Sequence, residues 1–91
     1  MSRYRRKSNQ TIEAWKIPSS TDEEGERQPH WLRLAINERR VTQYADGSYE
    51  VITPHGVTIA RPGDWIALDV ENGVYPIKGA IFDVLYEPVA A

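Results

Sequence analysis

Hydrophobic and polar side chains alternate most clearly between Thr11 and Ile17, near the start of the chain. This alternation, with β-branched and aromatic members, is typical of a half-buried strand. Pro18 closes the strand, because proline has no backbone N–H to donate to a ladder. The next segment, 19–28, contains no apolar residue, so we expect a flexible acidic loop there.

A different period follows the loop. Pro29 suits the first position of a helix, where a missing N–H costs nothing. Leu32, Ala35 and Ile36 then fall at helical spacing and form one apolar stripe that can lie on a sheet. The arginines at 39–40 suit the negative end of the helix dipole. The pattern therefore predicts a short helix between the loop and the next polar turn.

The segments 41–45 and 48–53 read as two strands that flank the Asp46-Gly47 pair. This pair is the usual sequence of a two-residue type I′ hairpin turn. The corresponding register places Tyr44 directly opposite Tyr49, where the two rings would form a stabilising cross-strand pair.

The remaining residues are rich in strand and turn signals. The pattern predicts turns at 54–56 and 61–64, strands at 57–60 and 65–70, and a hairpin at 72–73 that returns through 74–75. For 78–86 it favours a short helix over the alternative of a turn followed by a strand. Together these elements predict one α+β domain spanning 1–91. Its expected core is a small bent antiparallel β-sheet of five or six short strands, with one packed helix and a short C-terminal helix.

Charge is unevenly distributed along the chain, although the formal net charge is only −2. Residues 1–8 form a basic N-terminal arm that carries Arg3, Arg5, Arg6 and Lys7. The arm is a candidate surface for a partner; the alternatives are a solvated edge and a contact with the acidic loop. Strong nucleic-acid binders usually show a basic domain, so we expect no specific nucleic-acid partner.

The sequence contains no cysteine, which excludes disulfides, thiolate metal sites and a cysteine nucleophile. The first ten residues carry no apolar run of the kind that a secretory signal needs. The longest uncharged apolar stretch is far shorter than the ~20 residues of a membrane helix. We therefore expect a cytoplasmic protein with no membrane partner.

Five residues of the C-terminal half combine aromatic rings with charged groups: Arg61, Asp64, Trp65, Tyr75 and Lys78. Aromatic faces stack on nucleobases and cations hold phosphate, so this set is a candidate pocket for a small nucleotide. Ordinary structural roles compete with it. Residues 61–64 suit a tight turn, Trp65 suits a core, and Lys78 suits a solvated surface.

Six motifs follow one another along the chain: Tyr4-Arg5-Arg6-Lys7, Ile12-Glu13-Ala14-Trp15, Pro29-His30-Trp31-Leu32, Pro62-Gly63-Asp64-Trp65-Ile66, Tyr75-Pro76-Ile77-Lys78 and Ile81-Phe82 with Tyr86-Glu87. Their order and spacing resemble an uncharacterised family of small bacteriophage and prophage proteins. Ile77 and Gly79 depart from that family's pattern, which has cysteine and proline there. The resemblance implies a phage or prophage origin and action in the host-cell cytoplasm, and it carries over no catalytic residue.

No catalytic or metal-binding pattern stands out. His30 and His55 are the only histidines, whereas a zinc site needs at least three protein ligands. We therefore expect no metal, no cofactor and no enzymatic activity. The favoured function is a phage accessory protein that binds a host protein, such as an anti-phage defence component, or a small nucleotide signal.

The alternative function is a minor virion or assembly protein, which would oligomerise by pairing open strand edges. A nucleotide pocket in so small a domain also favours a subunit interface, so a homo-oligomer is expected in that case as well. A minimal nucleotide-processing enzyme is a third reading, but no motif supports it.

Overall fold

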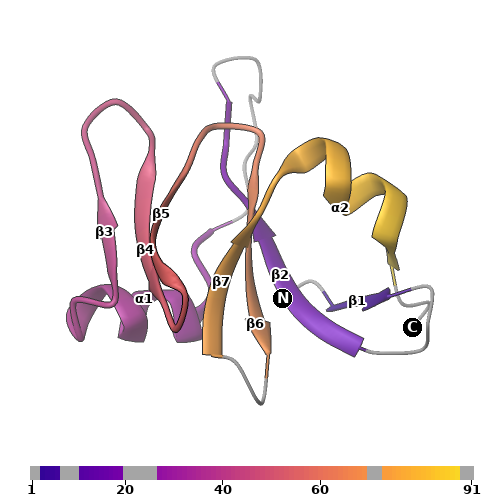
Figure 1. The fold of residues 1–91 in the computed structure, drawn as a ribbon, viewed down its shortest axis with the longest axis horizontal. Coiled ribbons are helices and arrows are strands. Elements are labelled where there is room, and N and C mark those ends of the chain that lie inside the picture. The colour runs from indigo at the N-terminus through magenta and orange to yellow at the C-terminus, as the bar shows by residue number, and fades with distance from the viewer. Residues whose placement is uncertain (1–2, 7–10, 20–26, 70–72, 89–91) are drawn as a thin grey trace.

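A computed structural model describes residues 3–6, 11–19, 27–69 and 73–88 of the 91-residue chain. These residues form eight strands and two short helices, and Figure 1 shows how the labelled elements are arranged. The elements are β1 (Arg3–Arg6), β2 (Thr11–Lys16), α1 (His30–Asn37), β3 (Val41–Gln43), β4 (Tyr49–Thr53), β5 (Gly56–Ala60), β6 (Trp65–Asp69), β7 (Gly73–Ile77), α2 (Gly79–Leu85) and β8 (Tyr86–Pro88). No helix in these residues is long and apolar enough to cross a membrane.

The strands form two antiparallel sheets rather than the single bent sheet that the sequence predicts. One sheet has five strands in the order β7-β6-β2-β1-β8, and the other has three in the order β3-β4-β5. The α+β class and both helices are confirmed, whereas the prediction of one sheet is wrong. The reason lies in the turn after β5, where the chain leaves one sheet and enters the middle of the other instead of continuing a meander.

Two strands of the five-stranded sheet were not predicted. Residues 3–6 of the basic arm form β1, which lies between β2 and β8. The three-residue strand β8 follows directly after α2. The local sequence pattern does not identify these two strands, because each is too short to show a hydrophobic period. Each is defined as a strand only by its pairing with a segment distant in the sequence.

The five-stranded sheet has an apolar cluster on each face. Ile66 lies in the larger cluster with α1 and the three-stranded sheet, whereas the next residue, Ala67, lies in the smaller cluster beneath α2. Successive side chains of a strand point to opposite faces, so β6 contributes to both clusters in turn. This strand is accordingly almost uniformly apolar and not alternating.

Helix α1 confirms the predicted stripe, since Leu32 and Ala35 are fully buried. The helix ends one turn earlier than the arginines suggest. Arg39 has a positive φ of 62°, and the N–H groups of Arg39 and Arg40 donate to the carbonyls of Ile36 and Ala35. These two bonds form a Schellman cap, in which a non-glycine residue occupies the strained left-handed position.

The hairpin between β3 and β4 differs from the predicted type I′ turn. The Gly47 N–H donates to the Tyr44 carbonyl, the Tyr44 N–H donates to the Ser48 carbonyl, and only Gly47 has a positive φ, of 91°. A type I turn followed by a left-handed glycine makes a three-residue loop, and a type I′ turn would need positive φ at two residues. The longer loop shifts the register, so Gln43 lies opposite Tyr49.

The predicted Tyr44–Tyr49 pair is therefore wrong. Tyr49 is buried and packs edge-on against Trp15, with the two ring centroids 5.6 Å apart, whereas Tyr44 is exposed on the other face. The Tyr44 hydroxyl donates to the Glu50 carboxylate at 3.1 Å instead. The strands predicted at 11–17, 57–60, 65–70 and 74–75 correspond to β2, β5, β6 and β7, and the C-terminal helix is confirmed as α2.

Candidate binding surface

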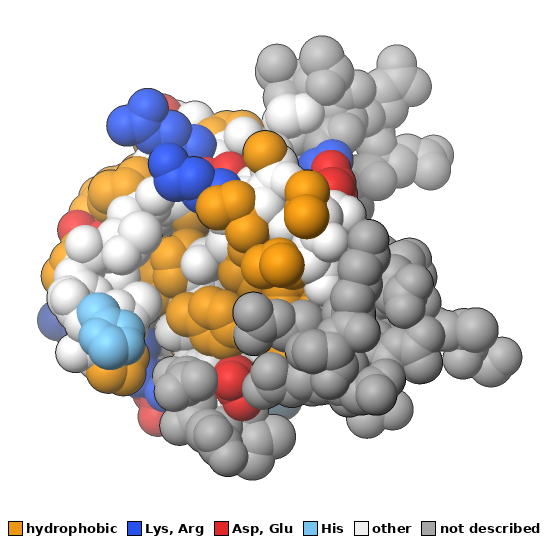
Figure 2. All heavy atoms as spheres, turned by 45° about the vertical axis from the view of Figure 1, so that its right-hand side comes forward, with side chains coloured by type: hydrophobic (Ala, Val, Ile, Leu, Met, Phe, Trp, Pro, Cys, Tyr) orange, Lys and Arg blue, Asp and Glu red, His pale blue; other side chains and the backbone are white. Residues whose placement is uncertain are grey.

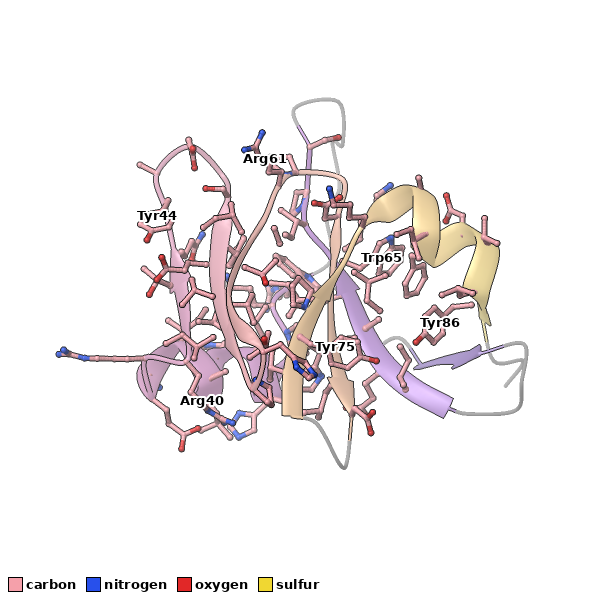
Figure 3. The ribbon with its side chains drawn as sticks, in the orientation of Figure 1. Arg40, Tyr44, Arg61, Trp65, Tyr75 and Tyr86 are labelled. Atoms are coloured by element: carbon pink, nitrogen blue, oxygen red, sulfur yellow. The ribbon has the colours of Figure 1, made fainter. Side chains whose placement is uncertain are left out.

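The predicted ligand residues do not meet in one pocket among the described residues. Arg61 lies at the connection between β5 and β6, Trp65 lies beneath α2, and Tyr75 lies on β7 (Figure 3). Arg61 and Lys78 are both exposed. None of the pairs formed by Arg61, Trp65 and Tyr75 is brought side by side in this view.

Asp64 has a structural role in this arrangement. One carboxylate oxygen accepts a hydrogen bond from the Arg61 N–H at 3.0 Å, and the other accepts one from the Gly79 N–H at 3.1 Å. The turn is closed by the Asp64 N–H, which donates to the Arg61 carbonyl at 2.8 Å. Asp64 therefore ties the β5–β6 turn to the start of α2, which is the turn chemistry that the sequence offered as the alternative.

The ring of Trp65 is already stacked. It lies parallel to Phe82 with ring centroids 3.9 Å apart, and Phe82 stacks in turn on Tyr86 at 5.0 Å. These three rings hold α2 against the sheet as part of the smaller apolar cluster. A nucleobase would have to compete with Phe82 for that face of Trp65.

The candidate partner residues Arg3, Arg5 and Arg6 belong to β1, an inner strand, and their side chains lie outside what the structure describes. Lys7 lies outside the described residues. The acidic loop is described only at its ends, where the Gln28 side-chain amide donates to the Tyr49 hydroxyl at 2.8 Å. This bond lowers the pKa of Tyr49, but burial raises the pKa more, so the net pKa lies above its ordinary value.

A pocket of about 370 Å³ lies between the β4–β5 turn and β7. Its lining consists of Thr53, Pro54, His55, Thr58, Tyr75 and Pro76. Tyr75 is the only one of these that the sequence marked as a ligand residue. The Thr53 hydroxyl donates to the Gly56 carbonyl and accepts from the His55 N–H, and these bonds hold the turn that forms one wall.

Strand β5 lies at the edge of the three-stranded sheet, next to this pocket. The Ile52 N–H donates to the Arg40 carbonyl, so the even-numbered residues of β4 direct their backbone groups toward β3. Because the direction alternates along a strand, the odd-numbered residues of β4 face β5. Their register partners on β5 are Gly56, Thr58 and Ala60.

The backbone N–H and C=O groups of Val57 and Ile59 consequently point away from β4, along the open edge. Gly56, Val57, Thr58 and Ile59 are all exposed among the described residues. The strand contains no charged residue and no proline. An edge of this kind is a template for pairing with another chain.

An apolar patch accompanies the edge on the outer face of the sheet. Val57 is 60% exposed, and its register partner Ile52 is 50% exposed. Ile59 lies beside them at 44% exposure, opposite Glu50. Glu50 therefore borders the patch. The hydrogen bond that its carboxylate accepts from the Tyr44 hydroxyl is the largest cause that raises the pKa of Tyr44 above its ordinary value.

A second apolar surface lies on the opposite side of the molecule. Ile81 and Val84 of α2 are 49% and 65% exposed. Figure 2, which turns the α2 side toward the viewer, shows hydrophobic side chains gathered there. This surface has no backbone edge, so it offers apolar area alone.

The sequence pattern contained some signals for this surface. It predicted the strand at 57–60 and the turn before it, but not that β5 ends a sheet or that Thr58 and Pro76 share a pocket. The uncharged run Gly56–Ala60 was the available signal, since solvent-exposed edges usually carry charge. Comparison of the chain with protein-family models, with curated proteins and with solved structures found no significant match.

Proposed function

We propose that the protein acts by binding another protein, and that the partner adds an extended segment to the β5 edge. The observation that carries the proposal is an open, uncharged edge strand whose outward backbone groups and apolar side chains lie together at Val57 and Ile59. Strand addition combines main-chain hydrogen bonds with side-chain contacts on both faces. The proposal assigns no catalytic step to the chain.

The resemblance to phage proteins gives the proposal its biological setting. In the cytoplasm of an infected cell, the partner would be a host protein, such as a component of anti-phage defence. Edge strands of most proteins are protected by charge, proline or a covering element, because an open edge promotes aggregation. An unprotected edge beside an exposed apolar patch is therefore costly unless a partner covers it.

A nucleotide-binding role has less support from the side-chain positions. Trp65 is stacked on Phe82, and Arg61 lies apart from Tyr75. Replacing Arg61 or Lys78 with Ala tests this role directly, since a nucleotide held by these cations would be lost in both variants. Native mass spectrometry of the protein from bacterial cells would reveal a retained nucleotide by its added mass.

A photo-crosslinking residue placed at position 57 tests the proposal in host-cell lysate, with the same residue at Thr42 as the control. Thr42 is exposed on the same sheet, but it lies on β3, at the opposite edge. A protein captured from position 57 and not from position 42 is then purified and its affinity measured. We expect Ile59→Lys to weaken binding at least tenfold and Thr42→Lys to leave it nearly unchanged.

Equal affinity of the partner for wild type and Ile59→Lys would contradict the proposal. Virion assembly makes a different prediction, because a structural protein is found in purified particles and self-associates through the edge. Particle composition and sedimentation of the isolated protein therefore separate the two functions.

A further inference from the structure

The pocket beside β5 lies on the face toward which one side chain of an added strand would point. Thr58 directs its backbone groups toward β4, so a strand added to the free edge faces Thr58 across a non-hydrogen-bonded pair. Side chains of such a pair lie on the same face and approach most closely. Thr58 lines the pocket, so the residue opposite Thr58 is directed into it.

The pocket walls combine apolar rings with the hydroxyl and imidazole groups of threonine, tyrosine and histidine side chains. Pro54 and Pro76 line the pocket from opposite sides, and Tyr75, which also packs against the smaller apolar cluster, lines it from β7. No carboxylate, lysine or arginine is among the lining residues. A charged side chain would lose hydration there without gaining an oppositely charged carboxylate, lysine or arginine, so the lining favours an uncharged occupant.

The volume of the pocket indicates the size of side chain that it can hold. About 370 Å³ lies near the lower limit of ligand pockets, which range over roughly 300–1,000 Å³. A small aliphatic side chain would leave most of this space open. An aromatic ring fills more of it and can pack on the proline rings, and aromatic anchors in such pockets dominate many protein interfaces.

We propose that the pocket lined by Thr58, Tyr75 and Pro76 binds an aromatic side chain of the added segment, at the position opposite Thr58. This inference rests on the proposed strand addition at β5. The backbone of the segment pairs with Val57 and Ile59, and its neighbouring residues lie against the apolar outer face. Edge pairing thus provides general affinity, and the pocket provides selectivity.

A displayed library of random nine-residue peptides, selected on the wild-type protein, tests the inference. We expect the retained peptides to share one aromatic position flanked by β-branched residues. Fluorescence anisotropy then compares a selected peptide with its aromatic-to-alanine version. The alanine version should bind at least tenfold more weakly, and because the change is in the peptide, folding of the protein is not affected.

Variants of the protein distinguish strand addition at β5 from binding of an aromatic side chain in the pocket. Ile59→Lys should abolish binding of both peptides, whereas Tyr75→Leu should weaken the aromatic peptide and leave the alanine peptide unchanged. Peptides that depend on Ile59 but show no aromatic preference would overturn the pocket assignment and leave strand addition intact. A selection that yields no peptide, or only peptides insensitive to Ile59→Lys, would overturn both.

Discussion

Strands β5 and β7 flank the same pocket, and both end a sheet, but their free edges differ in chemistry. The residues of β7 whose backbone groups point away from the sheet can be derived from the pairing of β6 with β2. The Ile17 N–H donates to the Asp64 carbonyl, so the backbone of Asp64 faces the β2 side. Alternation from that bond makes Asp64, Ile66 and Leu68 face β2, so Trp65, Ala67 and Asp69 face β7. Val74 and Pro76 then point outward from β7.

Pro76 thus occupies an outward position, where its missing N–H removes a donor from the free edge and costs the internal ladder nothing. Strand β5 has no such protection, because Val57 and Ile59 both present an N–H and a C=O outward. Of the two strand edges beside the pocket, that of β7 lacks a backbone donor at its proline, whereas that of β5 is open. This difference, more than the pocket itself, is the reason for proposing β5, and not β7, as the strand that a partner extends; both strands are labelled in Figure 1.

The largest expected effect comes from proline at adjacent positions of β5. Thr58→Pro removes an N–H that faces β4, so it should cost about 3 kcal/mol of unfolding free energy by breaking the ladder and leaving an acceptor unpaired. Ile59→Pro removes an outward N–H and should cost roughly half as much. Urea denaturation measures both values, and equal losses would show that the assigned edge direction is wrong.

The position of β7 at the pocket depends on the close approach of Gly79 to the β5–β6 turn. A Cβ added to Gly79 would meet the Gly63 carbonyl oxygen far inside van der Waals contact. Gly79→Ala should therefore destabilise the protein by about 2 kcal/mol through overpacking. Ala80→Gly, one residue along the helix, is the control for the helix propensity change. A thermal melt of Gly79→Ala that matched wild type would contradict this packing.

Restoring the missing donor on β7 should make its edge resemble that of β5. Pro76→Val supplies an outward N–H and a β-branched side chain, and it should change stability by less than about 1 kcal/mol. Sedimentation velocity should detect more self-association for Pro76→Val than for wild type. Association that is unchanged by Pro76→Val and reduced by Ile59→Lys would indicate that β5 alone is competent for pairing.

The smallest expected effect concerns the hairpin that sets the register of β4, and hence the outward residues of β5. Two hydrogen bonds from Ser48, from its hydroxyl at 2.6 Å and its N–H at 2.9 Å, hold the pKa of Asp46 below its ordinary value. A lowered folded-state pKa adds stability above the unfolded pKa of 3.8, and this is lost as pH falls through the folded pKa. Melting curves between pH 5 and pH 2 should therefore fall less steeply for Asp46→Asn; an identical pH dependence would contradict the assignment.

The sequence by itself determined the local elements whose cause is local. Leu32 and Ala35 recur at helical spacing, Asp64 follows a proline and a glycine in a turn, and the segment 57–60 alternates as a strand. Each of these elements depends on residues that are close neighbours in the sequence. The hairpin turn at Asp46-Gly47 was placed correctly, but its loop length was not, because the Asp46–Ser48 contact and the burial of Tyr49 favour the longer loop.

Only the tertiary structure decided which strands pair and which edges remain open. The division into two sheets, the inner position of β1, and the meeting of Thr58 with Pro76 all join segments far apart in the chain. A strand's own residues specify its alternation but not its neighbours, because the hydrogen bonds that define an edge are made by another segment. The candidate surface exists where those pairings stop, at β5.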